Sequence, residues 1–375
     1  MQDTLIKNGE DNPYYIYDAK KLSRKVRFFS KGFPGKIIYA VKANPLSFVL
    51  KEIKKNGIRA FDAASLNEVK LIRGLLPNAE IYFMNPVKSF SSIQQSYHKL
   101  NVKNFALDHD DELQKILTAT DYAKDLKLHL RMTVSNDSAK IPLTNKFGAK
   151  PTEVAHLLTR IKTFSNNIGV SFHNGSQCMN PNSYESSMKS IYDIVLKSGV
   201  KINSFNVGGG FPSEYINMKP EPLEEYFQKI KKTFAKFKFK NPVNLLAEPG
   251  RAIVSDSFSL VVRVELRKGR FLFINDGKFG NLFAAGEPGF SFPVKLLKKE
   301  KSSKLISFSL YGPTCDSGDF LKGPFFLPEN TDSGDLIELS NLGAYSFTMK
   351  TNFNGFLSKT KFFKKNRGKL IELDY

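Results

Sequence analysis

Eight short runs with the character of β-strands limit the possible folds of this chain more than any other feature. They occupy residues 36–43, 57–64, 79–86, 102–109, 126–134, 168–175, 202–210 and 243–251. Most neighbouring runs are separated by a stretch with helical spacing, such as SLNEVKLIRGLL, and the longer interval after the fifth run predicts an extended loop. Eight strand–helix units predict an α/β fold with a (β/α)8 barrel of the TIM type.

The pattern changes after residue 257. Segments such as SLVVRVEL and KLISFSLYG alternate polar and apolar residues with period two, and Gly- and Pro-rich turns separate them. This alternation is typical of an antiparallel β domain. We therefore expect a barrel domain at residues 20–257 and a C-terminal β domain at residues 258–375, with residues 1–19 packing on the β domain.

Composition and targeting signals restrict the class of protein. Hydrophobic residues make up 41% of the 375 residues, which is enough for a substantial core. No run of about 18 apolar residues and no signal-peptide pattern is present, so we expect no membrane partner. The two cysteines, Cys178 and Cys315, cannot form a disulfide framework, which fits a reducing compartment. These features predict a soluble, cytoplasmic protein.

The formal charge of +20 raises the question of a nucleic-acid partner, because basic proteins attract polyanions. The lysines, however, are spread along the chain in amphipathic stretches such as QKIKKTFAKFKFK. No zinc-finger spacing, aromatic RNA-binding signature or single basic arm accompanies them. We interpret them as solvated helix faces and expect no nucleic-acid binding, which salt-dependent binding to DNA or RNA would contradict.

The expected carboxyl ends of the barrel strands carry chemically active side chains. In chain order these are Lys42, Asp62, Asn85, Asp108, Arg131, His173, Gly208–Gly210, Glu248 and Arg251. Barrel enzymes keep their chemistry at this edge of the barrel. One polar residue at a strand end means little, but an amine, carboxylates, an imidazole, guanidinium groups and a triple glycine together predict an active site.

Lys42 lies in the segment YAVKANP, at the inner end of a run that otherwise looks buried. Taken alone, this segment favours a strand-end lysine that reaches solvent. Burial lowers the pKa of an amine, however, and a lowered pKa is what an amine needs to form a Schiff base. The other residues of the edge decide between these interpretations.

Those residues suit one cofactor. The triple glycine lets backbone N–H groups approach a phosphate, and Arg251 adds a planar donor fork. Glu248 can pair with a protonated ring nitrogen, and His173 offers a flat face for stacking. A plain turn is the simpler interpretation of the glycines, and a satisfied core residue is that of His173. Together with an amine at Lys42, the set describes pyridoxal phosphate (PLP) and predicts no metal.

The chain resembles the barrel-type PLP-dependent decarboxylases of ornithine, lysine, arginine and diaminopimelate, which share the alanine racemase fold. Among these it is most similar to the ornithine decarboxylases. The resemblance covers nearly the whole chain and rests on YAVKANP, FDAASLNEV, SFHNGSQ, VGGGFP and AEPGR in the barrel, and on YGPTCDSGD and GAYSF in the β domain.

The resemblance implies roles for individual residues. Lys42 would hold PLP as a Schiff base, Glu248 would pair with its ring nitrogen, and His173 would stack on its ring. Cys315 would return a proton to Cα, so that Lys42, Cys315 and His173 form the expected catalytic set. The resemblance also assigns residues to the rest of the cofactor: Asp62 and Arg131 beside the Schiff base, and Ser176, Gly208, Gly209, Gly210, Arg251 and Tyr345 around the phosphate.

The substrate is expected to be a basic amino acid. Asp316, in TCDSGD, resembles the residue that faces a distal ammonium in the decarboxylases of basic amino acids, whereas diaminopimelate enzymes usually have glutamate there. Glu287 stands where the family commonly has an aromatic-Asp-His segment, and Phe353 is expected to contact the substrate. Asn174 is a second departure, since a small apolar residue is usual at its position. Ornithine is the expected substrate, giving putrescine in polyamine biosynthesis, with lysine and arginine open.

Three alternatives share the fold. They are a diaminopimelate decarboxylase, an amino-acid racemase and a catalytically silent regulatory homologue. Glu248 and the GPTCDSGD segment favour decarboxylation over racemisation, and the presence of Lys42 and Cys315 argues against a silent homologue. The resemblance further implies a homodimer with shared active sites, in which residues of the β domain serve the partner's cofactor.

Overall fold

The computed structural model describes residues 12–134, 139–142, 146–286, 289–299, 302–356, 360–367 and 369–373. The chain forms two compact units. A barrel unit comprises Val26–Pro212 and Pro220–Gly250, and a sheet unit comprises Met1–Lys25, Ser213–Lys219 and Arg251–Tyr375. The contacts thus group residues 251–257 with the sheet, whereas the sequence pattern assigned them to the barrel.

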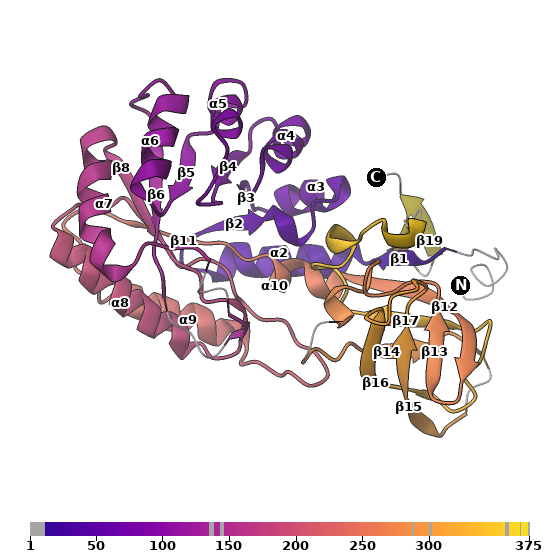
Figure 1. Cartoon of the computed structure of the whole chain (residues 1–375). Coiled ribbons are helices and arrows are strands. Elements are labelled where there is room, and N and C mark those ends of the chain that lie inside the picture. Colours follow the sequence, from indigo (N-terminus) through magenta and orange to yellow (C-terminus); the bar gives the residue numbers. More distant parts are fainter. Residues whose placement is uncertain are drawn as a thin grey trace. The chain divides into compact units, whose positions relative to one another are not determined.

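Eight parallel strands close the barrel in the order β10-β11-β2-β3-β4-β5-β6-β8 (Figure 1). Their bounds are β2 Lys36–Ala40, β3 Ala60–Ala63, β4 Glu80–Phe83, β5 Asn104–Leu107, β6 Lys127–Arg131, β8 Asn167–Ser171, β10 Ser204–Asn206 and β11 Asn244–Ala247. The predicted eight-stranded barrel is confirmed. Each strand is shorter than its apolar run because the chain bends into a turn at the barrel edge.

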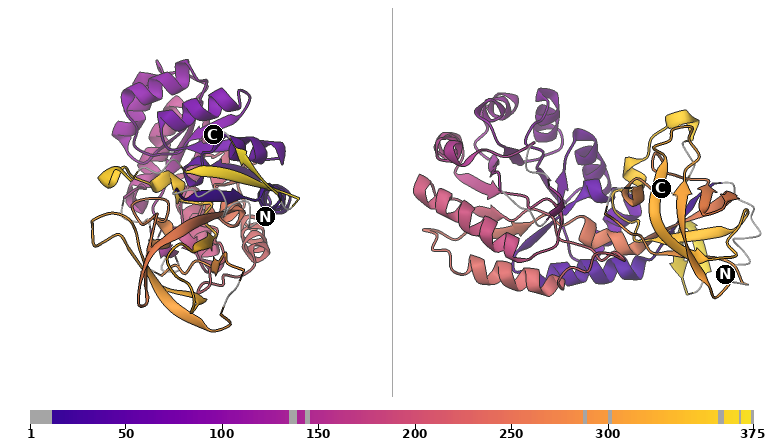
Figure 2. Two further views of the ribbon diagram at one scale, coloured as in Figure 1. Left: turned by 90° about the vertical axis from the view of Figure 1, so that its right-hand side faces the viewer. Right: turned by 60° about the horizontal axis from the view of Figure 1, so that its bottom comes forward.

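Helices follow the strands and lie outside them (Figures 1 and 2). They are α2 Ala19–Gly32, α3 Ser47–Lys55, α4 Leu66–Leu75, α5 Phe90–His98, α6 Asp110–Ala119, α7 Pro151–Phe164, α8 Asn182–Ser198 and α9 Leu223–Phe234. Side-chain hydroxyls cap the N-termini of two of them. Ser65 accepts a hydrogen bond from the backbone N–H of Glu68 at the start of α4, and Ser89 accepts one from the backbone N–H of Ser92 at the start of α5. Such caps satisfy backbone donors that the first helical turn leaves unpaired.

Apolar side chains fill the barrel and fix its strands. One cluster of buried residues joins five strands and the turn after β4: Ile38, Ala60, Tyr82, Met84, Ala106 and Leu246. Full burial of a large aliphatic or aromatic side chain contributes about 1.5–3 kcal/mol. The interior is therefore a packed core, and the chemistry is confined to the strand ends.

A buried ion pair braces the carboxyl edge of the barrel between β4 and β5. The side chain of Lys88 is 0% exposed, and its Nζ lies 2.9 Å from Glu112 Oε1. The same Nζ donates to the carbonyl oxygens of Asn85, at 2.9 Å, and Ala106, at 2.5 Å. Lys115 Nζ donates to the other oxygen of Glu112 at 2.5 Å. All three ammonium donors of Lys88 are thus used, which a buried charge requires.

The long interval between β6 and β8 contains more structure than the extended loop that the sequence predicted. A strand, β7 at Ala139–Ile141, pairs antiparallel with β9 at Ser176–Cys178. Residues 135–138 and 143–145 of this interval lie outside the described residues. The pairing brings a segment of the interval against the loop that follows β8.

Within its described residues, the sheet unit contains nine strands, mostly antiparallel as predicted. They are β1 Tyr14–Tyr17, β12 Phe258–Lys268, β13 Phe271–Ile274, β14 Val294–Leu296, β15 Leu305–Tyr311, β16 Phe320–Pro328, β17 Leu336–Ser340, β18 Lys361–Asn366 and β19 Lys369–Leu373. Two pairs are parallel, β1 with β18 and β13 with β15. A short helix, α10 at Arg251–Val254, precedes β12.

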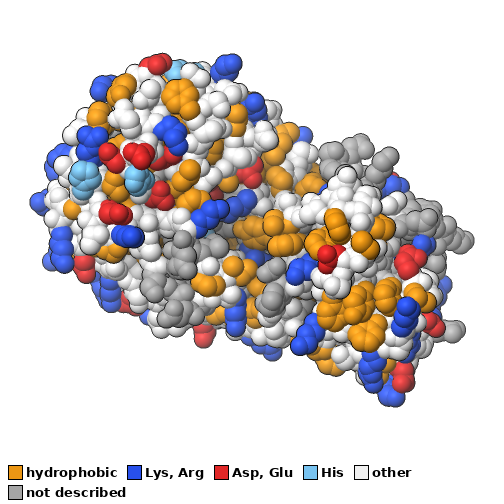
Figure 3. Space-filling view, in the orientation of Figure 1, with side chains coloured by type: hydrophobic (Ala, Val, Ile, Leu, Met, Phe, Trp, Pro, Cys, Tyr) orange, Lys and Arg blue, Asp and Glu red, His pale blue; other side chains and the backbone are white. Residues whose placement is uncertain are grey.

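Among the described residues, no helix combines the length and the hydrophobicity needed to cross a membrane. On the face drawn in Figure 3, lysine and arginine side chains are scattered among uncharged ones and do not gather into one patch. This distribution matches the dispersed lysines of the sequence.

Candidate active site

Lys42 lies just beyond the carboxyl end of β2. The strand ends at Ala40, and Lys42 occupies a 3-10 turn, Val41–Ala43, closed by the Asn44 N–H donating to the Val41 oxygen at 3.0 Å. Lys42 is exposed, with buried residues on both sides. The strand therefore ends two residues before Lys42, and Lys42 lies in the turn into which the apolar run breaks.

Asp62 and Arg131 lie on two other strands, at the same edge of the barrel. Asp62 is the third residue of β3, opposite Ala40, and is 4% exposed. Burial raises the pKa of its carboxyl, although the charges of Lys42 and Arg131 act in the opposite direction. Arg131 is the last residue of β6, and burial lowers the pKa of its guanidinium. The three side chains are close enough for their charges to interact.

His173 follows β8 by two residues. Its Nδ1 accepts a hydrogen bond from the Gly175 N–H at 3.1 Å, which places the proton of a neutral ring on Nε2. Burial lowers the pKa of the imidazole well below its ordinary value, and the positive charges of Arg131 and Lys42 lower it further. The ring is therefore uncharged at neutral pH.

Glu248 directly follows β11. Its Oε1 accepts a hydrogen bond from Asn206 Nδ2 at 2.6 Å. Burial, and then the charge of Asp62, raise the pKa of the carboxyl to about 7, while Lys42, Asn206 and Arg131 lower it. Asn206 was not predicted. Its position as the last residue of β10, two residues before the triple glycine, is the sequence signal that identifies it.

The triple glycine brings bare backbone to the edge between His173 and Glu248. Gly208 and Gly210 have positive φ values of 68° and 98°, which residues with a Cβ rarely adopt. A Cβ on Gly209 would lie 2.7 Å from the backbone carbonyl oxygen of Glu248 and 2.9 Å from His173 Nε2. Only glycine fits at this position, and the N–H of Gly208 donates to Asn206 Oδ1 at 2.8 Å. Ser176 is the first residue of β9 and is half-buried.

Two residues of the predicted edge, Asn85 and Asp108, form hydrogen bonds to the backbone of neighbouring loops. Asn85 Nδ2 donates to the Ala64 oxygen at 3.3 Å, and Asp108 Oδ2 accepts from the Gly148 N–H at 2.8 Å. The charge of Asp108 also raises the pKa of the Arg131 guanidinium, against the effect of burial. The edge thus combines chemically active residues with residues that order the loops between them.

In the sheet unit, Arg251 and Tyr345 lie together. Arg251, the first residue of α10, is 7% exposed, and its Cζ lies 5.0 Å from the centre of the Tyr345 ring. Its Nη1 donates to the Tyr215 hydroxyl at 3.0 Å, a partner that the sequence pattern missed. Tyr345 has a φ of +55°, a strained conformation for a tyrosine that costs about 1–3 kcal/mol and often marks functional sites.

Cys315 and Asp316 lie on an exposed turn of the sheet unit, between β15 and β16. Asp316 Oδ1 accepts a hydrogen bond from the Gly318 N–H at 2.7 Å. Phe353 is 42% exposed, and Glu287 lies outside the described residues. The other cysteine, Cys178, is 0% exposed. Cys315, Asp316 and Phe353, which are all expected to contact the substrate, thus belong to exposed parts of the sheet unit.

Comparison with known proteins decides the family. The family described as pyridoxal-dependent decarboxylase, pyridoxal binding domain, matches residues 19–255, more than half of the chain. The chain belongs to the pyridoxal-dependent decarboxylases. Its fold is that of their barrel-type members, and pyridoxal phosphate is the cofactor of the family.

Individual members of the family match over almost the whole decarboxylase chain. Ornithine decarboxylase of Caenorhabditis elegans is 30% identical, covering 92% of this chain and 86% of that protein. Antizyme inhibitor 2 of Xenopus laevis is 31% identical, covering 94% of this chain and 81% of that protein. The solved arginine decarboxylase of Paramecium bursaria Chlorella virus has a TM-score of 0.86 and 26% identity, covering 97% of this chain and 100% of that one.

The edge of the decarboxylase barrel fits the cofactor. The three glycines pack too closely against neighbouring backbone for a Cβ, and a backbone without side chains can approach a phosphate group closely. A neutral imidazole at His173 suits stacking on a ring, and a half-buried carboxyl at Glu248 suits a protonated ring nitrogen. Lys42 supplies an exposed amine at the same edge. These side chains meet the chemical needs of pyridoxal phosphate.

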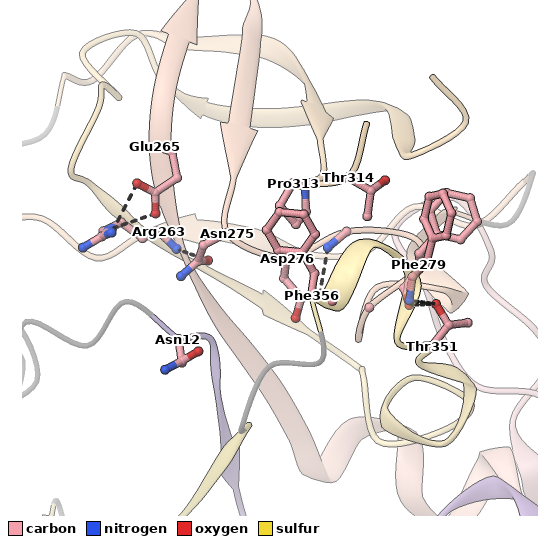
Figure 4. Close-up of a pocket in the computed structure, with 14 residues that line it drawn as sticks. Asn12, Arg263, Glu265, Asn275, Asp276, Phe279, Pro313, Thr314, Thr351 and Phe356 are labelled. Carbon is pink, nitrogen blue, oxygen red and sulfur yellow. Dashed lines mark hydrogen bonds and ion pairs between the residues drawn. The ribbon is translucent and has the colours of Figure 1, made fainter. Parts of the chain in front are cut away.

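The sheet unit of the decarboxylase contains a cavity of about 340 Å³ (Figure 4). Its lining includes Asp276, Phe279, Thr314, Thr351 and Phe353. Burial raises the pKa of Asp276 to about 6, whereas its hydrogen bonds with Asn281 and Gly277 lower it. The cavity therefore adjoins the segment that contains Cys315 and the loop that contains Phe353.

Proposed function

We propose that this protein catalyses the PLP-dependent decarboxylation of a basic amino acid, with ornithine as the preferred substrate and putrescine, a polyamine precursor, as the product. One observation carries the proposal: Lys42, Asp62, Arg131 and Glu248 interact through their charges at the carboxyl edge of one barrel. Ornithine is preferred because ornithine decarboxylases occur among relatives that match most of the chain.

The barrel residues hold and orient the cofactor in this proposal. Lys42 binds it through the side-chain amine, and Asp62 and Arg131 order the surrounding charges. His173 presents an uncharged ring for stacking, and Glu248 keeps a proton on the pyridine nitrogen. Bound there, PLP supplies the sink for the electron pair left when the substrate loses CO2. The phosphate is assigned to Ser176, Gly208, Gly209, Gly210, Arg251 and Tyr345.

The sheet residues select the substrate and control a proton. Cys315 delivers the proton that replaces the lost carboxylate at Cα. Asp316 binds the distal ammonium, a contact between charged groups worth about 1.5–3 kcal/mol when desolvated. Phe353 and Glu287 complete the recognition of the side chain, and the preference among ornithine, lysine and arginine depends on them.

We further propose that the enzyme is a homodimer with two shared active sites. In this arrangement, Lys42 of one subunit and Cys315 of the other serve the same cofactor. A closed twofold dimer makes two such sites. The family resemblance of the GPTCDSGD and GAYSF segments supports this part of the proposal.

A second candidate function is regulation by binding. The 31% identity with a protein named antizyme inhibitor supports it. The chain nevertheless contains both Lys42 and Cys315, which a purely binding role does not require. Decarboxylation is therefore the better supported function.

A panel assay separates these functions. Purified protein with added PLP is incubated with ornithine, lysine, arginine and diaminopimelate, and products are identified by mass spectrometry. We expect the amine of a basic amino acid, with putrescine formed fastest. Lysine released from diaminopimelate would reassign the substrate, and D-amino acids without CO2 release would indicate a racemase. No turnover of any substrate, with PLP bound, would support the binding function.

A further inference from the structure

A loop at residues 351–356 of the sheet unit is anchored to the turn that follows β13. The backbone N–H and the hydroxyl of Thr351 both donate to the Phe279 carbonyl oxygen, at 2.8 and 3.1 Å (Figure 4). The rings of Phe353 and Phe279 lie 5.4 Å apart. Although exposed, the loop is therefore held at two of its residues.

Asn354 connects this loop to the turn that carries Cys315. Its Oδ1 accepts a hydrogen bond from the backbone N–H of Cys315 at 3.1 Å, across 39 residues of sequence. Asn354 has φ 53° and ψ 15°, a left-handed conformation that glycine, asparagine and aspartate adopt more readily than other residues. The position needs both tolerance of this conformation and a side-chain acceptor, and asparagine provides both.

The turn around Cys315 is otherwise held by Asp319. Oδ2 of this buried aspartate accepts hydrogen bonds from the N–H and the hydroxyl of Thr314, at 3.1 and 2.8 Å. Its Oδ1 accepts one from the Lys278 N–H at 2.7 Å. Asp319 therefore fixes the residue before Cys315, and Asn354 fixes the backbone of Cys315 itself.

We propose that Asn354 is a positioning residue that sets the location of the Cys315 thiol for proton delivery. The inference rests on the proposed function, in which Cys315 protonates Cα. Phe353 and Asn354 are consecutive, so one anchored loop contacts the substrate side chain and holds the proton donor. Loss of the Asn354 acceptor should slow the step after CO2 loss and leave substrate binding unchanged.

Three full-length variants isolate the acceptor. Asn354→Gly removes it and keeps the left-handed backbone available. Asn354→Asp keeps an acceptor oxygen and also tolerates positive φ. Asn352→Gly is the matched control, because it loosens the same loop at a side chain without a hydrogen bond to any described residue.

The first measurement needs no cofactor. Amide hydrogen exchange at Cys315 should be at least about tenfold faster in Asn354→Gly than in the wild type, and unchanged in Asn354→Asp and Asn352→Gly, because only the first variant loses the bond. Iodoacetamide should modify Cys315 faster in Asn354→Gly, with the buried Cys178 as an unreactive internal reference. Equal exchange in wild type and Asn354→Gly would overturn the contact, whatever the protein's activity.

The second measurement uses the PLP-loaded enzyme. We expect kcat of Asn354→Gly to fall about tenfold with KM within twofold, since small misplacements of a reacting group are costly. Asn354→Asp should recover kcat to within about threefold of wild type. In a Cys315→Ala background, Asn354→Gly should cause no further loss. A further tenfold loss there would show that Asn354 acts elsewhere and would overturn the proposal, whereas inactive wild-type protein would contradict the proposed function alone.

Discussion

Glu248→Gln should stabilise the cofactor-free protein at pH 8, although it removes a residue of the proposed active site. The raised pKa means that the folded barrel binds the carboxyl proton more tightly than the unfolded chain does. A rise from 4.5 to about 7 corresponds to at most about 3.4 kcal/mol. Because Glu248 is only half-buried and the charge of Asp62 contributes to the rise, we expect about 2 kcal/mol. Glutamine preserves the acceptor for Asn206 and carries no charge.

The pH dependence gives the sign of the effect. With a raised folded-state pKa, the contribution to stability is fully present below pH 4.5 and is lost as the pH rises through about 7. The free energy of unfolding of Glu248→Gln should therefore equal that of the wild type near pH 4 and exceed it by about 2 kcal/mol at pH 8. With PLP bound, the difference should shrink, because the proposed ring-nitrogen contact stabilises the charged carboxylate.

Urea unfolding followed by circular dichroism measures these differences, since the chain has no tryptophan for fluorescence. Glu80→Gln is the matched control in the same barrel. Burial raises the pKa of Glu80, but Lys36, Tyr82 and Lys127 outweigh this effect and lower it overall, so this variant should lose stability at pH 8. A Glu248→Gln protein that is no more stable than wild type at pH 8 would refute the proposed charge balance.

Three further outcomes are expected. Lys88→Met should lower the free energy of unfolding by about 3–5 kcal/mol in urea titrations, because it leaves the buried carboxylate of Glu112 without its ion-pair partner. The double variant Lys88→Met/Glu112→Leu removes both charges and should lose much less, and equal losses would contradict this account. Asp316→Ala should raise KM for ornithine at least about tenfold in steady-state assays, and an unaltered KM would place the distal contact elsewhere. Mixed and exchanged Lys42→Ala and Cys315→Ala subunits should recover roughly a quarter of wild-type activity, whereas no recovery after confirmed exchange would exclude shared sites.

The barrel could be predicted because its evidence is local. Each strand and helix leaves a periodic pattern in a short window, and parallel strands place their carboxyl ends at one edge. Lys42, Asp62 and Glu248 could therefore be assigned to one edge from the sequence alone. Strand ends were less accurate, as Lys42 shows, because an apolar run continues into the turn beyond the strand.

Contacts between distant segments left no such pattern. β7 and β9 are three-residue strands that pair across the loop after β8, and neither has a detectable period. Lys88 looks like an ordinary surface lysine in NPVKSF, and its burial depends on Glu112 in the next strand–helix unit. Asn354 resembles any loop asparagine until its bond to Cys315 is seen. These features depend on tertiary packing, which single-sequence patterns do not encode.

Borohydride reduction tests the central claim most directly. The purified protein with PLP should be yellow, and reduction should attach the cofactor irreversibly to the peptide that contains Lys42, as determined by mass spectrometry. Lys42→Ala should lose this label and retain at most loosely bound PLP. Labelling of a different lysine in the wild-type protein, or unchanged labelling in Lys42→Ala, would contradict the assignment of the cofactor site to this edge of the barrel.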